Sequence, residues 1–161
     1  MAADTTKSDS APEDLLASLR ISEARLRGVL DSISDGFYAV DRNWRLTEFN
    51  AAAERYFALE RENLLGAIYL TLIEKASDDF KALLRAAMDG APMVVLETQS
   101  LYRPGHQVEL RIAPTEEGLC VALTDITDRL QTRAKLEAAV AERTAALQAS
   151  ESRVRAMVET S

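Results

Sequence analysis

The sequence predicts an α+β domain in which a small antiparallel sheet lies between two helices. Three observations lead to this class. Near the N-terminus, apolar residues recur at alternating steps of four and three. In the middle of the chain they alternate with polar residues, and after Asp125 the helical period returns. The predicted order is therefore a helix, two strands, several short helices, three strands and a long helix.

The composition fits one globular domain rather than two, because the chain has 161 residues, of which 47% are hydrophobic. Its net charge of −7 argues against a nucleic-acid or anionic-membrane partner, since both demand a basic surface. No apolar run approaches the roughly 18 residues that a membrane span needs, and the first residues, "MAADTTKSDSAPED", lack a signal peptide's features. We therefore expect a cytoplasmic protein without membrane insertion.

The N-terminal part predicts a paired helix. Residues 1–11 are small and polar and are interpreted as a disordered lead-in, and Ser10-Ala11-Pro12-Glu13 resembles a capping box that opens a helix over 12–34. The pattern is that of a short coiled-coil seam between two copies, with members Leu15, Leu19, Ser22, Leu26, Val29 and Ile33. Leu16 and Leu30 lie beside the seam and can pack on the helix's own domain, so both uses remain open.

The domain core is expected over 35–127. "DGFYAVD" and "WRLTEFN" predict two strands joined by the turn "DRN", and Asn50 is a plausible N-cap for the helix "AAAERYFA". Short helical pieces follow to Gly66, and a longer helix is predicted from Thr71 to Met88 before the Asp-Gly stop.

Three antiparallel strands are predicted next, from "MVVLETQSLYR", "HQVELRIAP" and "GLCVALTDI", with turns at "RPGH" and "TEEG". In the middle strand Val108, Leu110 and Ile112 alternate with polar residues, so one face should meet a core and the other water.

Residues 128–161 predict a long signalling helix, because neither Gly nor Pro interrupts them. One heptad frame forms a second dimer seam from Leu136, Val140, Leu147 and Val154, with Ile126 and Met157 at its ends. Four polar residues (Arg129, Arg133, Arg143 and Ser150) interrupt this seam. Two interpretations of these interruptions remain open. The helix pair is weak because it must change register, or the coiled coil is simply imperfect.

The last helical stretch also resembles the first. "SEARLRGVLDS" at Ser22–Ser32 aligns with "SESRVRAMVET" at Ser150–Thr160, with identical Ser, Glu and Arg positions and conservative apolar pairs. The spacing suits a whole small domain plus its connector, which predicts the start of a second module. Chance similarity between two surface helices is the alternative.

The segments "ISDGFYAVDRNWRLTEFNAAAERYFALERENLLG" (Ile33–Gly66) and "GLCVALTDITDR" (Gly118–Arg129) resemble a PAS domain. The resemblance covers about residues 22–130, and "AVAERTAALQASESRVRAMVE" resembles the connectors between PAS modules. It implies a five-stranded antiparallel sheet in the order 2-1-5-4-3, with helices covering one face and enclosing a small cavity.

The cofactors known in this family match the sequence poorly. Flavin-adduct photosensors carry a reactive Cys where this chain has Tyr69. Haem sensors ligate iron through a His on the helix that corresponds to the one predicted from Thr71 to Met88, and here that helix contains no His. His106 lies in a turn and is interpreted as a solvated side chain. Cys120 is interpreted as a buried inert thiol, and as the only cysteine it excludes an internal disulfide and a cysteine-rich zinc cage. We therefore expect no metal and either no cofactor or a small organic ligand.

Eleven residues are candidates to line the implied cavity: Phe37, Leu46, Tyr56, Phe57, Ile68, Tyr69, Phe80, Leu84, Tyr102, Leu110 and Val121. Each of them also suits an ordinary core, and the cavity can be empty. Asp125 and Thr127 are candidates to couple the sheet to the last helix, with plain helix capping as the alternative.

The sequence contains no catalytic constellation, and we expect no enzyme activity from this chain. The leading hypothesis is a sensory and dimerising module of a bacterial signalling protein. The commonest parent is a two-component sensor histidine kinase, whose downstream domains would be partners in the same polypeptide. The alternatives are a ligand-free dimerisation or protein-interaction scaffold, and a module of a cyclic-dinucleotide enzyme or transcription regulator.

Overall fold

The computed structural model describes residues 10–160 and follows the predicted order of elements. The expected lead-in lies outside the described residues except at its end, where the first helix already begins at Ser10. The elements are α1 (Ser10–Ser32), β1 (Gly36–Asp41), β2 (Leu46–Phe49), α2 (Ala51–Phe57), α3 (Arg61–Leu64), α4 (Tyr69–Leu72), α5 (Asp78–Met88), β3 (Val94–Gln99), β4 (Gln107–Pro114), β5 (Gly118–Asp125) and α6 (Thr127–Glu159).

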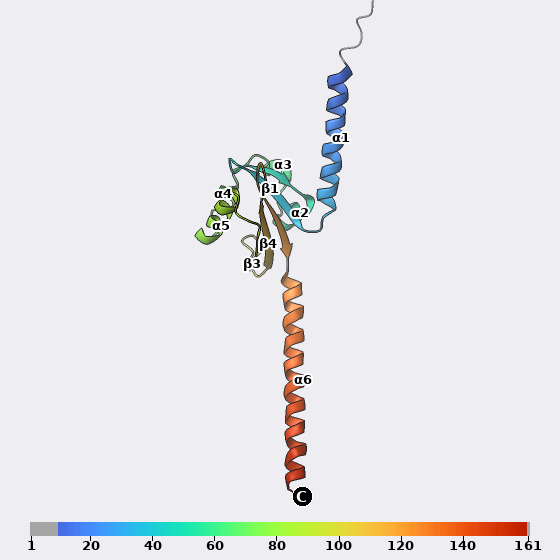
Figure 1. Ribbon diagram of the computed structural model, residues 1–161, viewed down its shortest axis with the longest axis vertical. Helices are drawn as coiled ribbons and strands as arrows, with labels where there is room; N and C mark the ends of the chain where they lie inside the picture. Colours follow the sequence, from blue (N-terminus) through green and yellow to red (C-terminus); the bar gives the residue numbers. More distant parts are fainter. Residues whose placement is uncertain (1–9, 161) are drawn as a thin grey trace, which may run out of the picture.

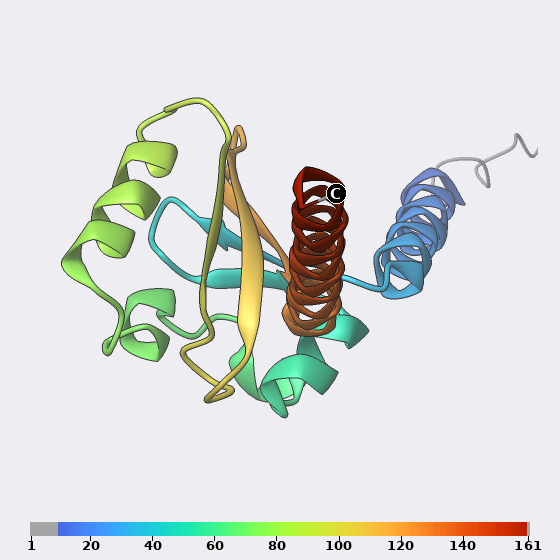
Figure 2. The same cartoon turned by 90° about the horizontal axis from the view of Figure 1, so that it is seen from below.

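The five strands form one antiparallel sheet in the order β2-β1-β5-β4-β3, which confirms the predicted order. Helix α2 packs against β1, and α5 packs against β4 and β5. The two cartoon views show α4 and α5 on one side of the sheet, with the two long helices toward the other (Figures 1 and 2). The domain thus has two layers with one core between them.

Alternation along the strands decides which residues enter this core. Tyr38 on β1 pairs with Val121 on β5, which pairs with Ile112 on β4, so these three side chains share the inner face. All three are buried, with exposed fractions of 4%, 0% and 1%. The predicted alternation of Val108, Leu110 and Ile112 is confirmed, because each of them is buried.

Asn50 joins four segments of the fold and is itself buried. Its Oδ1 accepts hydrogen bonds from the backbone N–H of Phe37 and of Ala53, and the latter bond is the predicted N-cap of α2. Its Nδ2 donates to the carbonyls of Leu30 and Asp35 at 2.9 and 3.0 Å. One amide therefore fixes the end of α1 against the start of β1 and α2.

The prediction of one helix over Thr71–Met88 is wrong, because the segment forms two helices, α4 and α5, separated by a turn. Ser77 is the cause: its hydroxyl accepts a hydrogen bond from the Phe80 N–H and caps α5, and two acidic residues follow in the first turn. The break lets Ile73 and Ala76 both enter the core.

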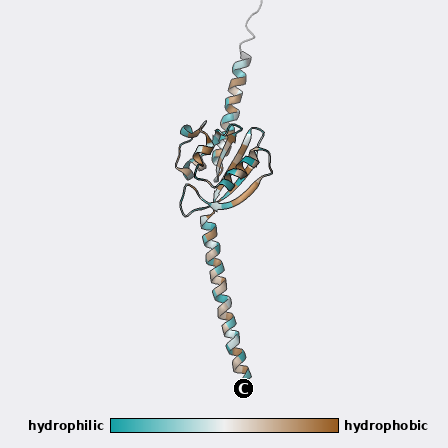
Figure 3. Ribbon diagram, turned by 90° about the vertical axis from the view of Figure 1, so that its left-hand side faces the viewer, coloured by the Kyte–Doolittle hydropathy of each residue, from teal (hydrophilic) through white to brown (hydrophobic). Residues whose placement is uncertain are grey.

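The two long helices leave the domain at opposite ends (Figure 1). Their apolar and polar residues are interspersed along the length, as Figure 3 shows. Nine apolar residues of the two predicted seams are at least 40% exposed: Leu15, Leu19, Leu26, Val29, Ile33, Leu136, Val140, Leu147 and Val154. Ile126 differs from the predicted frame, because it is 1% exposed and belongs to the domain core. Within residues 10–160, no helix has the length and apolar character of a membrane span.

Candidate ligand pocket

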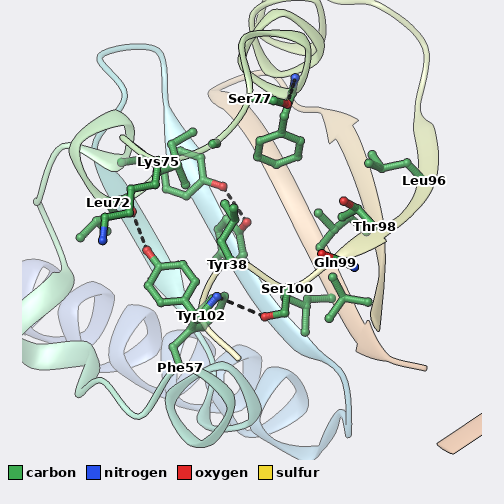
Figure 4. A pocket seen from close by; sticks show the side chains of 18 of the residues that line it. Tyr38, Phe57, Leu72, Lys75, Ser77, Leu96, Thr98, Gln99, Ser100 and Tyr102 are labelled. Carbon is green, nitrogen blue, oxygen red and sulfur yellow. Dashed lines mark hydrogen bonds between the residues drawn. The ribbon is translucent and has the colours of Figure 1, made fainter. Parts of the chain in front are cut away.

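A half-open cavity of about 450 Å³ lies between the inner face of the sheet and the layer of short helices. A volume of this size suits a drug-sized small molecule. Figure 4 shows Tyr38 of β1, Leu96 and Thr98 of β3, and Leu72 and Ser77 of the helical side among the residues that line it. The cavity is therefore formed by segments that are far apart in the sequence and close only in the fold.

Six of the eleven predicted pocket residues line this cavity: Leu46, Phe57, Tyr69, Phe80, Tyr102 and Leu110. They come from β2, α2, α4, α5, the β3–β4 loop and β4. The fold thus brings together residues that are distant in the sequence and that the sequence identifies only by their apolar or aromatic side chains.

The other five predicted residues do not line the cavity, for different reasons. Leu84 and Val121 are fully buried and fill the core instead. Phe37 neighbours Tyr38 on β1, so alternation directs its side chain to the opposite face of the sheet. Ile68 precedes α4 and is 37% exposed. Tyr56 lines a second, smaller cleft.

Sequence reasoning missed most of the wall. The most important of the missing residues is Tyr38, because the prediction places its neighbour Phe37 in the cavity wall instead. The other lining residues are Phe49, Leu59, Leu64, Leu72, Ile73, Lys75, Ala76, Ser77, Asp79, Leu83, Leu96, Thr98, Gln99, Ser100, Leu101, Val108 and Leu123. The alternation of β4 offered a signal for Val108, which shares a face with Leu110.

Two buried tyrosines meet in the cavity wall. The hydroxyl oxygens of Tyr38 and Tyr69 lie 2.7 Å apart and share a hydrogen bond. Burial raises the pKa of Tyr38 and raises the pKa of Tyr69 well above its usual value. Both phenols are therefore neutral and protonated at physiological pH, and both can act as hydrogen-bond donors.

Aromatic rings surround this pair. Phe57 lies edge-on to Tyr38 and to Tyr102, with ring centroids 6.1 and 4.8 Å apart. Phe49 is tilted against both Phe57 and Tyr38. Edge-to-face pairs of this kind are favoured by the ring quadrupoles.

The β3–β4 loop closes one side of the cavity. The Tyr102 hydroxyl donates to the carbonyl of Leu72 at the end of α4, with a distance of 2.7 Å, as Figure 4 shows. The Ser100 hydroxyl oxygen accepts hydrogen bonds from the Tyr56 hydroxyl and from two backbone N–H groups of the loop. The loop is thus tied to the helical layer through side chains.

Among the described lining residues, Lys75 and Asp79 carry charge, and both are exposed. They belong to the segment from α4 to α5 at the rim. The interior of the cavity is consequently lined by uncharged groups.

The predicted coupling residues Asp125 and Thr127 form a compact joint between β5 and α6. Asp125 Oδ1 accepts hydrogen bonds from the Thr127 N–H and hydroxyl, and Asp125 Oδ2 lies 2.7 Å from His106 Nδ1. The Thr127 hydroxyl oxygen accepts from the Gln107 N–H, which fastens the joint to β4. Burial acts to raise the pKa of Asp125, but the hydrogen bonds from Thr127 and His106 lower it below its usual value.

His106 is therefore not simply solvated as expected, because it pairs with Asp125. Cys120 is half-buried rather than buried, and burial raises the pKa of its thiol, which disfavours the reactive thiolate. Within residues 10–160, no group of three or more His, Cys, Asp or Glu side chains is placed to hold a metal ion.

Comparison with known proteins identifies the fold family. A family model described as the PAS fold matches residues 30–131, which is well over half of the chain. The chain belongs to the PAS family, whose domains are sensory modules rather than enzymes. A comparison with curated proteins gives no match.

Solved structures share this fold at low sequence identity. A PAS domain from Colwellia psychrerythraea is 18% identical, with a TM-score of 0.55 over 67% of this chain and 98% of that one. A sensory box sensor histidine kinase from Vibrio cholerae is 18% identical, with a TM-score of 0.50 over 70% of this chain and 98% of that one. An RNA-binding light-oxygen-voltage receptor is 18% identical with a TM-score of 0.55. The match covers 87% of this chain but only 41% of the receptor.

Proposed function

We propose that this chain is a ligand-sensing and dimerising module of a cytoplasmic bacterial signalling protein, with a sensor histidine kinase as the favoured parent. The carrying observation is the half-open cavity of about 450 Å³, whose wall includes strands that continue into the joint of α6. This module is expected to catalyse no reaction itself. The module's output would be a change in how its helices pack.

The route from cavity to helix follows β4 and β5. Leu123 lines the cavity, and two residues later Asp125 Oδ1 accepts a hydrogen bond from the N–H of Thr127, the first residue of α6. A ligand that prefers one arrangement of these strands would shift the population of α6 packings through its differential affinity. Asp125→Ala should therefore alter the dimer or the parent's output. If both remain unchanged, plain helix capping explains the joint.

Dimerisation is proposed through the seams of α1 and α6. Their apolar residues are exposed in the single chain, and pairing in a parallel coiled coil would bury them. Leu19→Glu combined with Leu26→Glu should shift the chain toward monomer in sedimentation equilibrium. Ala24→Glu, on the opposite side of α1, is the matched control and should leave the association constant unchanged. A wild-type chain that is monomeric at all concentrations would contradict this part of the proposal.

The ligand part is tested by blocking the cavity. Leu96→Trp places a large ring in the wall, whereas Val95→Trp places it on the other face of the same strand. Native mass spectrometry of purified wild-type protein should detect a co-purifying small molecule that Leu96→Trp loses and Val95→Trp retains. Equal occupancy in the two variants would contradict binding in this cavity.

A second candidate is a ligand-free scaffold, which the exposed apolar residues of both long helices favour independently of the cavity. In that case the seam variants would disrupt assembly, while the cavity variants would have no effect on output. RNA binding, which the similar light-oxygen-voltage receptor shows, is not proposed for this chain, because its net charge is −7.

A further inference from the structure

We propose that the cavity takes an uncharged, mostly aromatic small molecule with one hydrogen-bond acceptor, and that the Tyr38–Tyr69 hydroxyl pair binds this acceptor. The inference rests on the proposed ligand-sensing function and adds the chemical class of the ligand. It follows from the number of hydroxyl protons on the tyrosine pair, from the positions of the charged lining residues and from the aromatic rings in the cavity wall.

The proton count leaves one donor free. Each phenol carries one proton, and a single contact of 2.7 Å joins the two oxygens. One hydroxyl donates to the other, and the accepting hydroxyl keeps its own proton. The structure gives neither hydroxyl a second hydrogen-bond partner among the described residues. Because Tyr38 and Tyr69 are only 4% and 5% exposed, the free proton has little access to bulk water and is available to a group inside the cavity.

The charge distribution selects a neutral acceptor. The charged lining residues in the described part of the chain are Lys75 and Asp79, both exposed at the rim. A carboxylate placed against the tyrosine pair would be buried without a counter-ion, which is costly. A ketone, ester or ether oxygen can accept the phenol proton without that cost.

The wall also favours rings. Phe57 forms T-shaped contacts with the rings of Tyr38 and Tyr102, and Phe80 of α5 also lines the cavity. Aromatic walls of this type stack with flat, uncharged ligands. The ligand's apolar body would therefore lie among these rings, with its acceptor directed at the tyrosine pair.

Three probes of similar size separate these requirements: 2-acetylnaphthalene, 2-isopropylnaphthalene and 2-naphthoate. The first has a neutral acceptor, the second has none, and the third is charged. Dissociation constants are measured by titration calorimetry for wild type and for the double variant Tyr38→Phe/Tyr69→Phe. This variant removes both hydroxyls without changing ring volume, and loss of both partners of a hydrogen bond is nearly neutral for folding.

Tyr56→Phe is the matched control, because its hydroxyl bonds to Ser100 and its side chain does not line the cavity. The ratio of ketone to hydrocarbon affinity should fall roughly 3- to 10-fold in the double variant and stay constant in Tyr56→Phe. The carbonyl stretching frequency of the bound ketone should be lower in wild type than in the double variant, as expected for a ketone that accepts a hydrogen bond.

The outcomes distinguish this inference from the function on which it rests. If ketone and hydrocarbon bind wild type but their ratio is the same in the double variant, the inference is overturned and ligand sensing stands. Tighter binding of 2-naphthoate than of the ketone also overturns it. If none of the probes binds, the assignment of the ligand class is overturned, and the mass spectrometry of Leu96→Trp decides separately whether the cavity binds any ligand.

Discussion

His106 and Asp125 form a hydrogen-bonded pair, with His106 Nδ1 2.7 Å from Asp125 Oδ2. The pair connects the loop that enters β4 with the last residue of β5. The other oxygen of the same carboxylate accepts a hydrogen bond from the Thr127 N–H at the start of α6, so the loop, the sheet and the long helix meet at one side chain.

This arrangement predicts a specific pH dependence of stability. The pKa of Asp125 is lower in the folded chain than its ordinary value of 3.8. A lowered carboxyl pKa stabilises the folded state above the ordinary value, and that stabilisation is lost as the pH falls through the lower, folded value. We therefore expect wild type to be more stable than Asp125→Asn near neutral pH, with a difference that shrinks in acid. Urea unfolding at pH values from about 6 to about 3 measures this difference. A constant difference across the range would contradict the prediction.

Asn50→Ala should destabilise the fold by about 2–4 kcal/mol, because four hydrogen bonds are lost and buried backbone groups are left unpaired. The measurement is the free energy of unfolding from urea titration. Asn63→Ala is the control, since Asn63 is exposed and bonds only to Glu60. Asn50→Asp should be intermediate. It keeps the two bonds that the side chain accepts, and it places a carboxylate oxygen against the carbonyls of Leu30 and Asp35. Similar stabilities of Asn50→Ala and Asn63→Ala would refute the role of this residue.

Gly118→Ala should destabilise the sheet, whereas Gly28→Ala should not. A Cβ at Gly118 would overlap the Val40 carbonyl and lie 2.9 Å from the Asp41 backbone, which cannot move without breaking β1 from β5. The expected loss is about 1–3 kcal/mol or more. Gly28 lies within α1 with nothing near its Cβ position, so alanine there should stabilise the helix by about 0.5–1 kcal/mol. Thermal unfolding of both variants tests the contrast, and a stable Gly118→Ala protein would contradict it.

Arg129 should orient the start of α6 rather than stabilise the domain. Its guanidinium contacts Glu97 on β3 and Glu109 on β4, at 3.3 and 3.4 Å. A hydrogen bond from Arg111 and the nearby Arg129 hold the pKa of Glu109 below its usual value, so the network is charged at neutral pH. Arg129→Gln should change the unfolding free energy by less than about 1 kcal/mol. It should also speed hydrogen exchange in the first turns of α6.

Arg133→Gln is the control for this prediction, because its partner Glu137 lies within α6 itself. Exchange in the first turn should be unaffected by that change. The effect of Arg129→Gln should also disappear at about 1 M salt, where charges on the surface are screened. Equal exchange rates in the two variants at low salt would show that the contacts to β3 and β4 do not hold the helix.

The order of elements could be predicted because it depends on local signals. Asn50 caps α2 by accepting a hydrogen bond from the nearby Ala53 N–H, and polar turns separate the strands of each predicted hairpin. The prediction does not include the break between α4 and α5, although Ser77 and the two acidic residues after it are typical of a helix start. The continuous apolar spacing around them concealed the signal, since Ile73 and Ala76 are core residues in a turn.

The pocket could be predicted only in part, because its wall depends on tertiary placement. The prediction places Phe37 of β1 in the wall, but neighbouring residues of a strand face opposite sides of the sheet, and Tyr38 is the one that lines the cavity. The prediction therefore also lacks the residue that forms a hydrogen bond with Tyr69. Leu84 and Leu83 are adjacent on α5, yet Leu84 fills the core and Leu83 lines the cavity. The composition of the helix does not distinguish them. Their roles are decided by how α5 lies on β4 and β5.

Helices α1 and α6 leave the domain at opposite ends (Figure 1). The number of residues in α6 therefore sets the direction in which its distal side chains point relative to the sheet. Each residue removed from an α-helix turns everything beyond it by about 100° and draws it back by about 1.5 Å. A one-residue deletion early in α6 would therefore rotate Val154 to another side of the rod, while a seven-residue deletion would nearly restore its direction. The fold thus converts chain length into rotational alignment between the sheet and the distal turns of the helix.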